Sequence, residues 1–303
     1  MEGLRDYIRS KRQLSDGSVN TYYYLLKSVW KSVYGINEKD MKFEDFNSDK
    51  IYDYVKEHRP KTTISALCVV TENPRMRKLM EEELAKQKVE KAKQVKTEKQ
   101  EENWLSSTEI EKKFDELKKK VPAWYKTGDF QDIQQYILLA LLGGLFMSPR
   151  RSKDWFDFKI KNVDYEKDNF MIREKVLEKG DELQFSPAGK KEDVFVFNSY
   201  KGSGVKGQQI VRIPPALLKI LKKWIESNPT DYLLYDKNNA PLTAIKINQR
   251  FEKIFGKQAS VNLLRHTHLT DKFGDINDTV KEIKKTMVGM GSSIQQFETY
   301  VKV

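Results

Sequence analysis

The amino-acid sequence predicts a mostly α-helical protein with a small antiparallel β-sheet, an α+β fold divided into two domains. Apolar residues recur at helical spacing along most of the chain, whereas residues 158–213 alternate apolar and polar side chains between turn residues. The charged stretch 75–103 is almost free of large apolar residues after Met80, which is typical of a solvated helix. We therefore expect a helical domain over 1–73, a charged helical linker over 74–103 and a second domain over 104–303.

The expected first domain contains three segments with helical patterns. The segment "SVNTYYYLLKSVWKSVYG" (18–35) places its apolar residues at helical spacing, and Gly35 is a suitable stop. Shorter helices are expected in "NSDKIYDYVKEH" (47–58) and "KTTISALCVVTEN" (61–73). This part of the chain is therefore predicted to be a small helical unit.

The expected second domain begins with a helix in "NWLSSTEIEKKFDELKKK" (103–120), which Ser106 or Ser107 can cap. The apolar run 131–147 predicts a buried helix that ends at "SPRRS". The strand patterns "FKIKNVDYEKDNFMIRE", "DVFVFNSY" and "QQIVRIP" then predict a small antiparallel sheet. Further helices are expected at 215–227, 243–256, 261–273 and 276–289.

Composition restricts the class of protein and of partner. The chain has 303 residues, 39% of them hydrophobic, which is enough for a real core, and a net charge of +11, which favours polyanionic partners such as nucleic acid. Cys68 is the only cysteine, so a disulfide framework within the chain is excluded, and its apolar context predicts a buried, unreactive thiol. The start of the chain lacks a signal peptide, and the apolar run at 136–146 is too short to span a bilayer. We expect a soluble intracellular protein with no membrane partner.

Several kinds of active site are excluded by the motifs. The sequence has no Walker loop, no dinucleotide-binding glycine fingerprint and no cluster of acidic metal ligands. "GSGVKG" (202–207) lacks the GK[ST] ending of a phosphate loop and lies between two strand patterns, so it predicts a β-hairpin turn. His266 and His268 are two residues apart and would face different sides of a helix, whereas a metal pair on a helix needs a spacing of four. We therefore expect no metal and no cofactor.

Four cationic or tyrosine-bearing segments remain, and together they suggest a family. These are "SPRRSKDWFDF", "NSYKGSGVKG", "LLRHTHLT" and "MGSSIQQFETYVK". In order and spacing they resemble the catalytic segments of the tyrosine recombinase (phage integrase) family. The resemblance covers 104–303 and, weakly, the first domain. It implies a helical core-binding domain followed by a catalytic domain, the two forming a C-shaped clamp on duplex DNA.

The resemblance also implies roles for individual residues. Arg151 matches the family's first catalytic arginine, with Arg150 as the alternative, and Asp154 is the acid that follows it. Arg265 matches the second arginine, and His266 matches the residue after it. The family's hairpin lysine falls on Lys201, with Lys206 as the alternative, and the nucleophile falls on Tyr300. His268 has no assigned role.

The implied chemistry is DNA breakage and rejoining without metal or ATP. The tyrosine oxygen attacks a backbone phosphate to give a 3′-phosphotyrosyl intermediate, two guanidiniums bind the non-bridging oxygens, and the lysine protonates the departing 5′ oxygen. Two positions depart from the pattern, because Asn262 and Ser292 stand where the family has histidines. These departures imply reduced activity. Both residues are expected to be site residues, with Asn262 hydrogen-bonding a phosphate oxygen or the tyrosine hydroxyl and Ser292 donating to the phosphate.

Other hypotheses stay open from the sequence. The chain could be a catalytically weakened or inactive DNA-binding protein with a recombinase fold, or a type IB topoisomerase. An RNA-binding or membrane-surface protein would need only the net charge and would leave the four segments unexplained.

Duplex DNA is the expected partner, with a homo-tetramer on DNA and a monomer or dimer when free. The source suggested by the residue usage is a large DNA virus or mobile element, which places the protein in the cytoplasm or nucleus of a host cell, or in a virion. Besides Arg150 and Lys206, the expected DNA contacts are Arg5, Arg9, Lys11, Arg12, Lys27, Lys31, Lys61 and Thr62.

Overall fold

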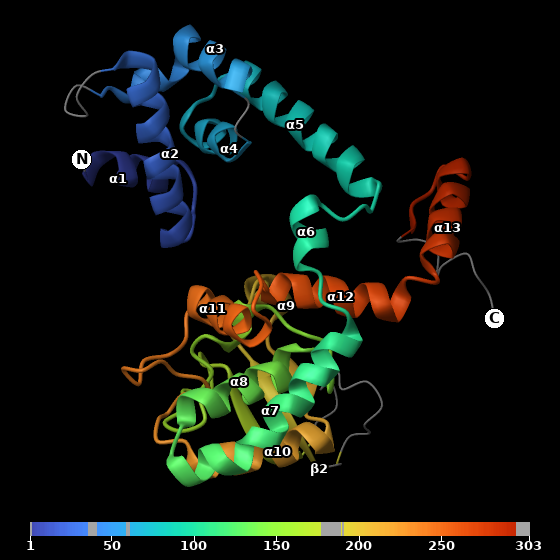
Figure 1. Cartoon of the computed structure of the whole chain (residues 1–303). Coiled ribbons are helices and arrows are strands. Elements are labelled where there is room, and N and C mark those ends of the chain that lie inside the picture. The colour runs from blue at the N-terminus through green and yellow to red at the C-terminus, as the bar shows by residue number, and fades with distance from the viewer. Residues whose placement is uncertain (1, 36–40, 59–60, 177–188, 190, 295–303) are drawn as a thin grey trace. The chain divides into compact units, whose positions relative to one another are not determined.

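The computed structural model describes residues 2–35, 41–58, 61–176, 189 and 191–294, and it divides the chain into two compact units, 1–96 and 97–303 (Figure 1). In these ranges the elements are mostly helices with one three-stranded antiparallel sheet. The expected fold class, mostly α with a small antiparallel sheet, is confirmed. No helix of the described ranges is long and apolar enough to cross a membrane.

The first unit is built from helices packed around one apolar core. Its elements are α1 (Glu2–Lys11), α2 (Asp16–Tyr34), η2 (Phe43–Asn47), α3 (Asp49–His58), α4 (Lys61–Val70) and α5 (Pro74–Ala92). The helix α2 begins where the Ser15 side chain accepts a hydrogen bond from the Ser18 amide, and it ends at Gly35, whose φ of 66° suits a glycine. The predicted stop at Gly35 is confirmed.

The segment expected to be a linker, 74–103, is helical over α5 and over α6 (Glu98–Asn103). Its first turns belong to the first unit, because Met76 is 0% exposed and Leu79 is 3% exposed in that unit's core. Beyond these residues α5 is largely exposed, as its charged sequence requires. The helical core of the first unit therefore continues past residue 73.

The second unit contains the remaining helices around a larger core. They are α7 (Ser107–Thr127), α8 (Phe130–Leu142), η3 (Ser152–Trp155), α9 (Ser203–Lys206), α10 (Pro215–Ser227), α11 (Ala244–Phe255), α12 (Val261–Phe273) and α13 (Asn277–Gly289), with α6 before them. Ser106 caps α7 and forms a capping box with Glu109. The apolar helix α8 ends earlier than expected, because Gly143 and Gly144 turn the chain, the second with a φ of 79°.

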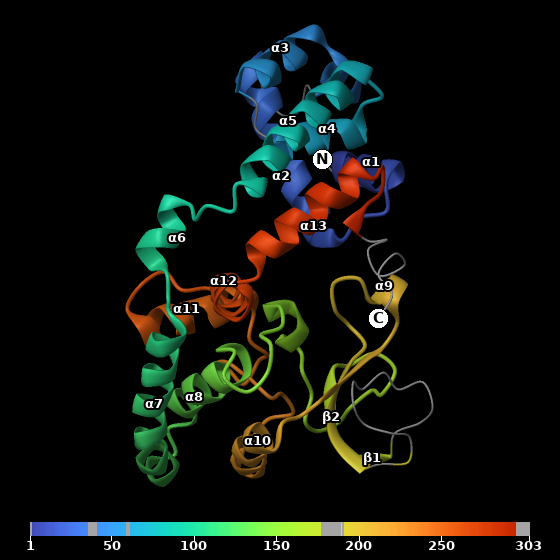
Figure 2. The ribbon, with the colours of Figure 1, turned by 90° about the vertical axis from the view of Figure 1, so that its right-hand side faces the viewer.

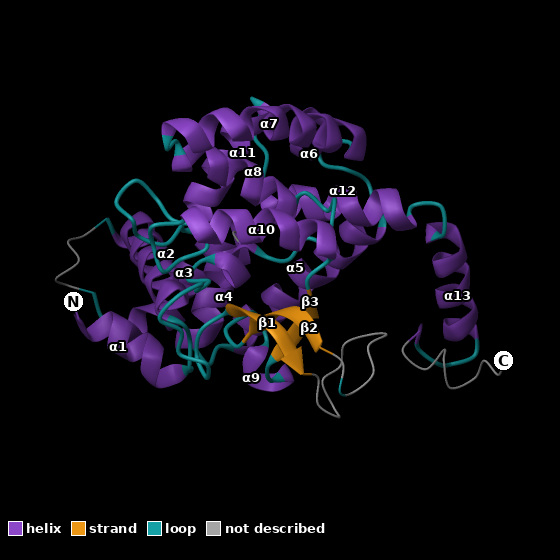
Figure 3. Cartoon of the chain, turned by 90° about the horizontal axis from the view of Figure 1, so that it is seen from below, coloured by secondary structure: helices purple, strands orange, loops and turns teal. Residues whose placement is uncertain are grey.

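The sheet consists of β1 (Phe170–Val176), β2 (Lys191–Phe197) and β3 (Gln209–Arg212) in the order β1-β2-β3, all antiparallel (Figure 3). In register, Phe170 lies opposite Val196 and Phe195 lies opposite Val211. The expected β-hairpin at 202–207 is confirmed, since β2 and β3 are consecutive antiparallel strands, and its turn contains the one-turn helix α9 between glycines with positive φ. The β2–β3 connection is therefore a longer loop that carries Lys201 and Lys206.

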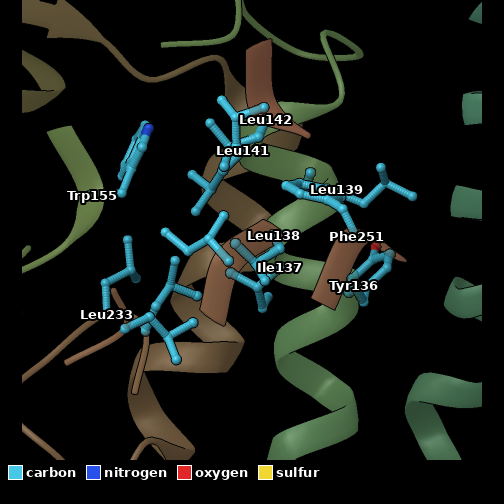
Figure 4. Close-up of a cluster of buried hydrophobic side chains, with 14 of the residues drawn as sticks. Tyr136, Ile137, Leu138, Leu139, Leu141, Leu142, Trp155, Leu233 and Phe251 are labelled. Carbon is cyan, nitrogen blue, oxygen red and sulfur yellow. The ribbon is translucent and has the colours of Figure 1, made fainter. Parts of the chain in front are cut away.

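The helix α8 is buried from Ile133 to Leu142 and lies next to α7 in the second unit (Figure 2). It packs against α7, α10 and α11, and Figure 4 shows Leu138 and Leu141 of α8 within the apolar cluster that includes Leu233 and Trp155. Trp155 also contacts the rings of Phe195 and Phe197 edge-on, which joins the helices to β2. The turn between α8 and η3 is thus held between the helical core and the sheet. This turn carries the two arginines of "SPRR".

Candidate functional site

An open pocket of about 410 Å³ in the second unit gathers side chains from three separate parts of the sequence. These parts are the turn after α8, the β2–β3 hairpin and helix α12. The pocket is lined by Met147, Ser148, Pro149, Arg150, Arg151, Asp154, Tyr200, Lys201, Lys206, Gln209, Val211 and Arg265. Five of these side chains are cationic and one is a carboxylate, so the pocket is suited to an anion.

The two neighbouring arginines of the turn differ in their contacts. The Nε of Arg150 donates to Asp154 Oδ2 at 2.8 Å and its Nη2 donates to Gln209 Oε1 at 3.0 Å. The same guanidinium lies 3.9 Å from the ring centroid of Phe197. Arg151 is exposed, and its side chain makes no hydrogen bond or ion pair with any described residue. Arg150 therefore ties the turn to the sheet, whereas Arg151 is available to a ligand.

Asp154, the acid of the arginine turn, is 3% exposed. Burial raises the pKa of Asp154, and the positive charges of Arg150, Arg151 and Arg265 oppose that rise. Its Oδ1 atom has no hydrogen-bond partner among the residues described. One buried carboxylate thus lies in the field of three guanidiniums, which places both candidate catalytic arginines near the same point.

Arg265 is positioned by the packing of α12. The helix begins at Ser260, whose side chain accepts from the Leu263 amide, and the hydroxyl of buried Thr267 donates to Leu105 O at 2.8 Å. These contacts hold one face of α12 against the core. The half-buried Arg265 lies on another face of the helix and lines the pocket. Within the described ranges its guanidinium has no hydrogen-bond or ion-pair partner. A partly buried, unpaired charge is costly, and an anion in the pocket would remove that cost.

The lysines of the β2–β3 connection both line the pocket. The Tyr200 hydroxyl donates to Gly207 O at 2.8 Å, which closes the loop that contains α9. Lys201 and Lys206 are both exposed on this loop. The structure brings either ammonium group to the pocket, so the choice of Lys201 over Lys206 stays a prediction from the sequence pattern.

Two other expected site residues, Asn262 and Ser292, are not among the residues that line this pocket. Asn262 is exposed on α12, and Ser292 follows α13, where its amide donates to Met287 O at 2.8 Å. Tyr300 lies outside the described residues. The structure thus brings together Arg151, Lys201 and Arg265, and it leaves Asn262 and Ser292 outside the pocket lining. Ser148, Tyr200 and Gln209 line the pocket although the sequence pattern assigned them no role.

Histidines and acids form no metal site in the part of the chain that the structure describes. His266 is exposed, whereas His268 is half-buried and its Nε2 lies 3.2 Å from Ser148 Oγ. Burial lowers the pKa of His268, and Lys272 lowers it further while Asp271 raises it. The second histidine therefore contacts the arginine turn.

The cations expected to contact DNA from the first unit differ in availability. Arg5 donates to Asn20, and its guanidinium carbon lies 3.8 Å from the ring centroid of Tyr23. Arg9 pairs with Asp16, and this contact raises the pKa of Arg9. The side chain of Lys61 hydrogen-bonds to Gln87, and Lys27 lies 5.9 Å from the ring centroid of Tyr23. Thr62 and Lys31 are exposed.

A small pocket of about 200 Å³ in the first unit is lined by cations, and the sequence pattern did not select one of them, Arg77. Lys11, Arg12 and Arg77 line this pocket together with Cys68. Cys68 is half-buried rather than fully buried as expected, and burial raises the pKa of its thiol. Arg77 lies in the charged segment, where sequence alone offered no reason to select one cation among many.

Comparison with known proteins gives likeness of fold only. No protein-family model and no curated protein matches the chain. Among solved structures, XerA recombinase is 16% identical, with 90% of this chain and 84% of that chain covered and a TM-score of 0.34. A lambda integrase fragment and a longer lambda integrase, each a dimer bound to a COC′ core site, are 10% and 12% identical, with TM-scores of 0.45 and 0.40. Both alignments cover 92% of this chain, together with 89% of the fragment and 72% of the longer lambda integrase. These likenesses are too low to assign an activity, which must come from the residues of the site.

Proposed function

We propose that this chain is a site-specific DNA recombinase of the tyrosine recombinase type. The observation that carries the proposal is the pocket, in which Arg151, Lys201 and Arg265 converge from three distant parts of the sequence. Both arginines have guanidiniums without a protein partner in the described ranges, which suits two-point binding of a phosphodiester. The pattern "MGSSIQQFETY" supplies the tyrosine that such a site requires.

The proposed reaction is an in-line phosphoryl transfer on DNA. Tyr300 Oη attacks the backbone phosphorus, the P–O5′ bond breaks, and a 3′-phosphotyrosyl bond forms, so that no external energy source is needed. Arg151 and Arg265 bind the non-bridging oxygens and stabilise the charge of the transition state. Lys201 donates a proton to the departing 5′ oxygen, a general-acid role worth about 10²–10⁴ in rate. Attack by a 5′ hydroxyl reverses the steps and rejoins the strand.

Duplex DNA is the proposed substrate, with its scissile phosphate in the pocket of the second unit. The exposed cations of the first unit, including Arg12 and Lys31, would contact phosphates on one side. A homo-tetramer on DNA would bring together the sites that exchange strands. Such a substrate places the protein inside a cell or virion, and a viral or mobile-element source is part of this proposal.

One observation favours a second candidate, a DNA-binding protein of recombinase fold with weakened or lost activity. Asn262 and Ser292, which replace the family's histidines, do not line the pocket, so the described residues include no histidine among its lining. This candidate predicts DNA binding without strand cleavage. A type IB topoisomerase would instead relax supercoiled DNA without exchanging strands between sites.

Covalent capture on a nicked duplex tests the proposal. The nick lies close to the scissile phosphate, so the short 5′ product diffuses away and traps the 3′-phosphotyrosyl adduct. We expect an adduct from the wild-type chain and a loss of at least about 100-fold in its rate for Arg151→Ala or Arg265→Ala. Arg173→Ala, on β1 and outside the pocket, is the matched control and should cleave at the wild-type rate. Tight DNA binding without any adduct would select the second candidate.

A further inference from the structure

A serine and a histidine meet at the rim of the pocket in a way that the proposed chemistry does not use. Ser148 precedes the arginine pair, is exposed and lines the pocket. Its Oγ lies 3.2 Å from Nε2 of His268, which lies 120 residues later in the sequence. Arg265 lies on the same helix as His268, about one turn earlier. The contact therefore joins the two chain segments that carry the candidate catalytic arginines.

The histidine ring is held in one place by the backbone beneath it. Gly144 has a φ of 79°, and a Cβ built there would lie 2.8 Å from His268 Nδ1 and 3.4 Å from its Cγ. A side chain at position 144 would therefore displace the ring, and the glycine allows the ring to lie against the turn. A half-buried ring packed on glycine and bonded to Ser148 loses little freedom when a ligand arrives.

The charge state of the histidine follows from its surroundings. Burial lowers the pKa of His268, and the charge of Lys272 on the same helix acts in the same direction. Asp271, also on α12, opposes them, and the facing residues of the turn, Gly144 and Ser148, carry no charge. Above its lowered pKa the imidazole is neutral, with one nitrogen as donor and the other as acceptor.

A neutral ring can direct the serine proton into the pocket. A serine hydroxyl has one donor and two acceptor positions, so when His268 Nε2–H donates to Oγ, the serine proton stays available. The ligand that the pocket's cations favour is an anion, and a phosphate oxygen accepts such a proton. Donation in the opposite sense, from Ser148 to the ring, leaves the serine without a proton for phosphate.

We propose that Ser148 is a further phosphate ligand of this pocket and that His268 is the positioning residue that orients its hydroxyl. The inference rests on the proposed function for its substrate, a DNA phosphodiester, and it adds a neutral hydrogen bond to the two guanidiniums. The serine hydrogen bond strengthens as charge develops on the phosphate oxygens, so it contributes to the rate of cleavage as well as to binding.

Two assays of the full-length chain test the inference. The first measures single-turnover adduct formation on the nicked duplex at saturating DNA. Ser148→Ala and His268→Leu should each slow this step by about 10- to 100-fold, the range for a hydrogen bond to a charged group. The double variant should be no slower than the slower single variant, because the two residues act as one unit. His268→Gln, which keeps a side-chain N–H, should recover part of the rate.

The second assay measures binding of inorganic sulfate through the ring NMR signal of His268. Ser148→Ala should weaken sulfate binding about tenfold, and Thr270→Ala, an exposed residue on the same helix, should change neither assay. If the wild type forms no adduct but Ser148 still governs sulfate binding, the proposed recombinase function fails while the phosphate ligand stands. Wild-type behaviour of Ser148→Ala in both assays overturns the inference, as does a double variant whose losses multiply.

Discussion

Replacement of Arg150 by methionine should destabilise the second unit, whereas replacement of its neighbour Arg151 should not. The side chains of Arg150 and Asp154 are 18% and 4% exposed, and their ion pair spans 2.8 Å. Without Arg150 the buried carboxylate loses the hydrogen bond that Arg150 Nε donates to Oδ2, and Oδ1 already has no partner among the described residues. Removing one member of a buried pair costs about 3–5 kcal/mol. Because Arg151 and Arg265 remain near Asp154, we expect the lower end, about 3 kcal/mol.

The measurement is urea unfolding of the full chain, with Arg151→Met as the matched control. The control should stay within about 0.5 kcal/mol of wild type, because Arg151 is exposed and unpaired in the described ranges. Arg150→Met/Asp154→Asn should recover most of the loss, since no buried charge is then left without its partner. A loss below about 1 kcal/mol for Arg150→Met, or one equal to that of the control, would refute the structural role of Arg150.

The same variant should show a defined pH dependence. Burial raises the pKa of Asp154 in the folded chain, so this group stabilises the fold most below its unfolded pKa, and the contribution is lost as pH rises through the folded pKa. Removal of Arg150 takes away the largest opposing charge and raises that pKa further. The deficit of Arg150→Met relative to wild type should therefore shrink as the pH falls from neutral through the raised pKa of Asp154. A deficit that is constant over this range would contradict the assigned cause.

Three further outcomes follow from the fold and the site. Gly144→Ala should lower the free energy of unfolding by about 1–3 kcal/mol, because the φ of 79° strains an alanine and the new Cβ contacts the His268 ring. Urea unfolding measures this loss, and an unchanged free energy of unfolding would contradict it. Thr267→Val should lower the free energy of unfolding by about 1–3 kcal/mol, because Leu105 O loses its buried hydrogen-bond donor. A loss below about 0.5 kcal/mol would show that this hydrogen bond contributes little to stability. DNA affinity should fall steeply with salt, and Arg12→Gln should reduce the slope of log K against log salt by about 1. A flat salt dependence would exclude these phosphate contacts.

The elements that the sequence predicted well are those with a local cause. The helix α2 follows from apolar spacing and from Gly35, and the three strands follow from alternation between turn residues. The end of α8 was harder, because the run 131–147 stays apolar beyond Leu142 while Gly144 bends the backbone. The charges at the start of α5 outnumber its apolar residues, so the pattern predicts a linker there, although Met76 and Leu79 anchor these turns in the core of the first unit.

The sequence selects some residues of the candidate site, but it does not reveal the contacts between distant segments of the chain. The order of the segments was enough to select Arg151, Lys201 and Arg265, which the structure brings to one pocket. The sequence could not decide between Arg150 and Arg151, because the partners of Arg150 include Gln209, 59 residues away. The contact between Ser148 and His268 spans 120 residues and has no local signal. Tyr300 lies outside the described residues, so its role stays a prediction.

The central claim is that Tyr300 forms the covalent bond to DNA. The most direct measurement incubates the wild-type chain with a nicked duplex, digests the product and locates the nucleotide adduct by mass spectrometry. We predict a phosphotyrosyl linkage on the peptide that contains Tyr300, and none from Tyr300→Phe, whereas Tyr165→Phe, an exposed tyrosine outside the pocket lining, should behave as wild type. An adduct on any other residue, or an equal yield from Tyr300→Phe, would contradict the claim.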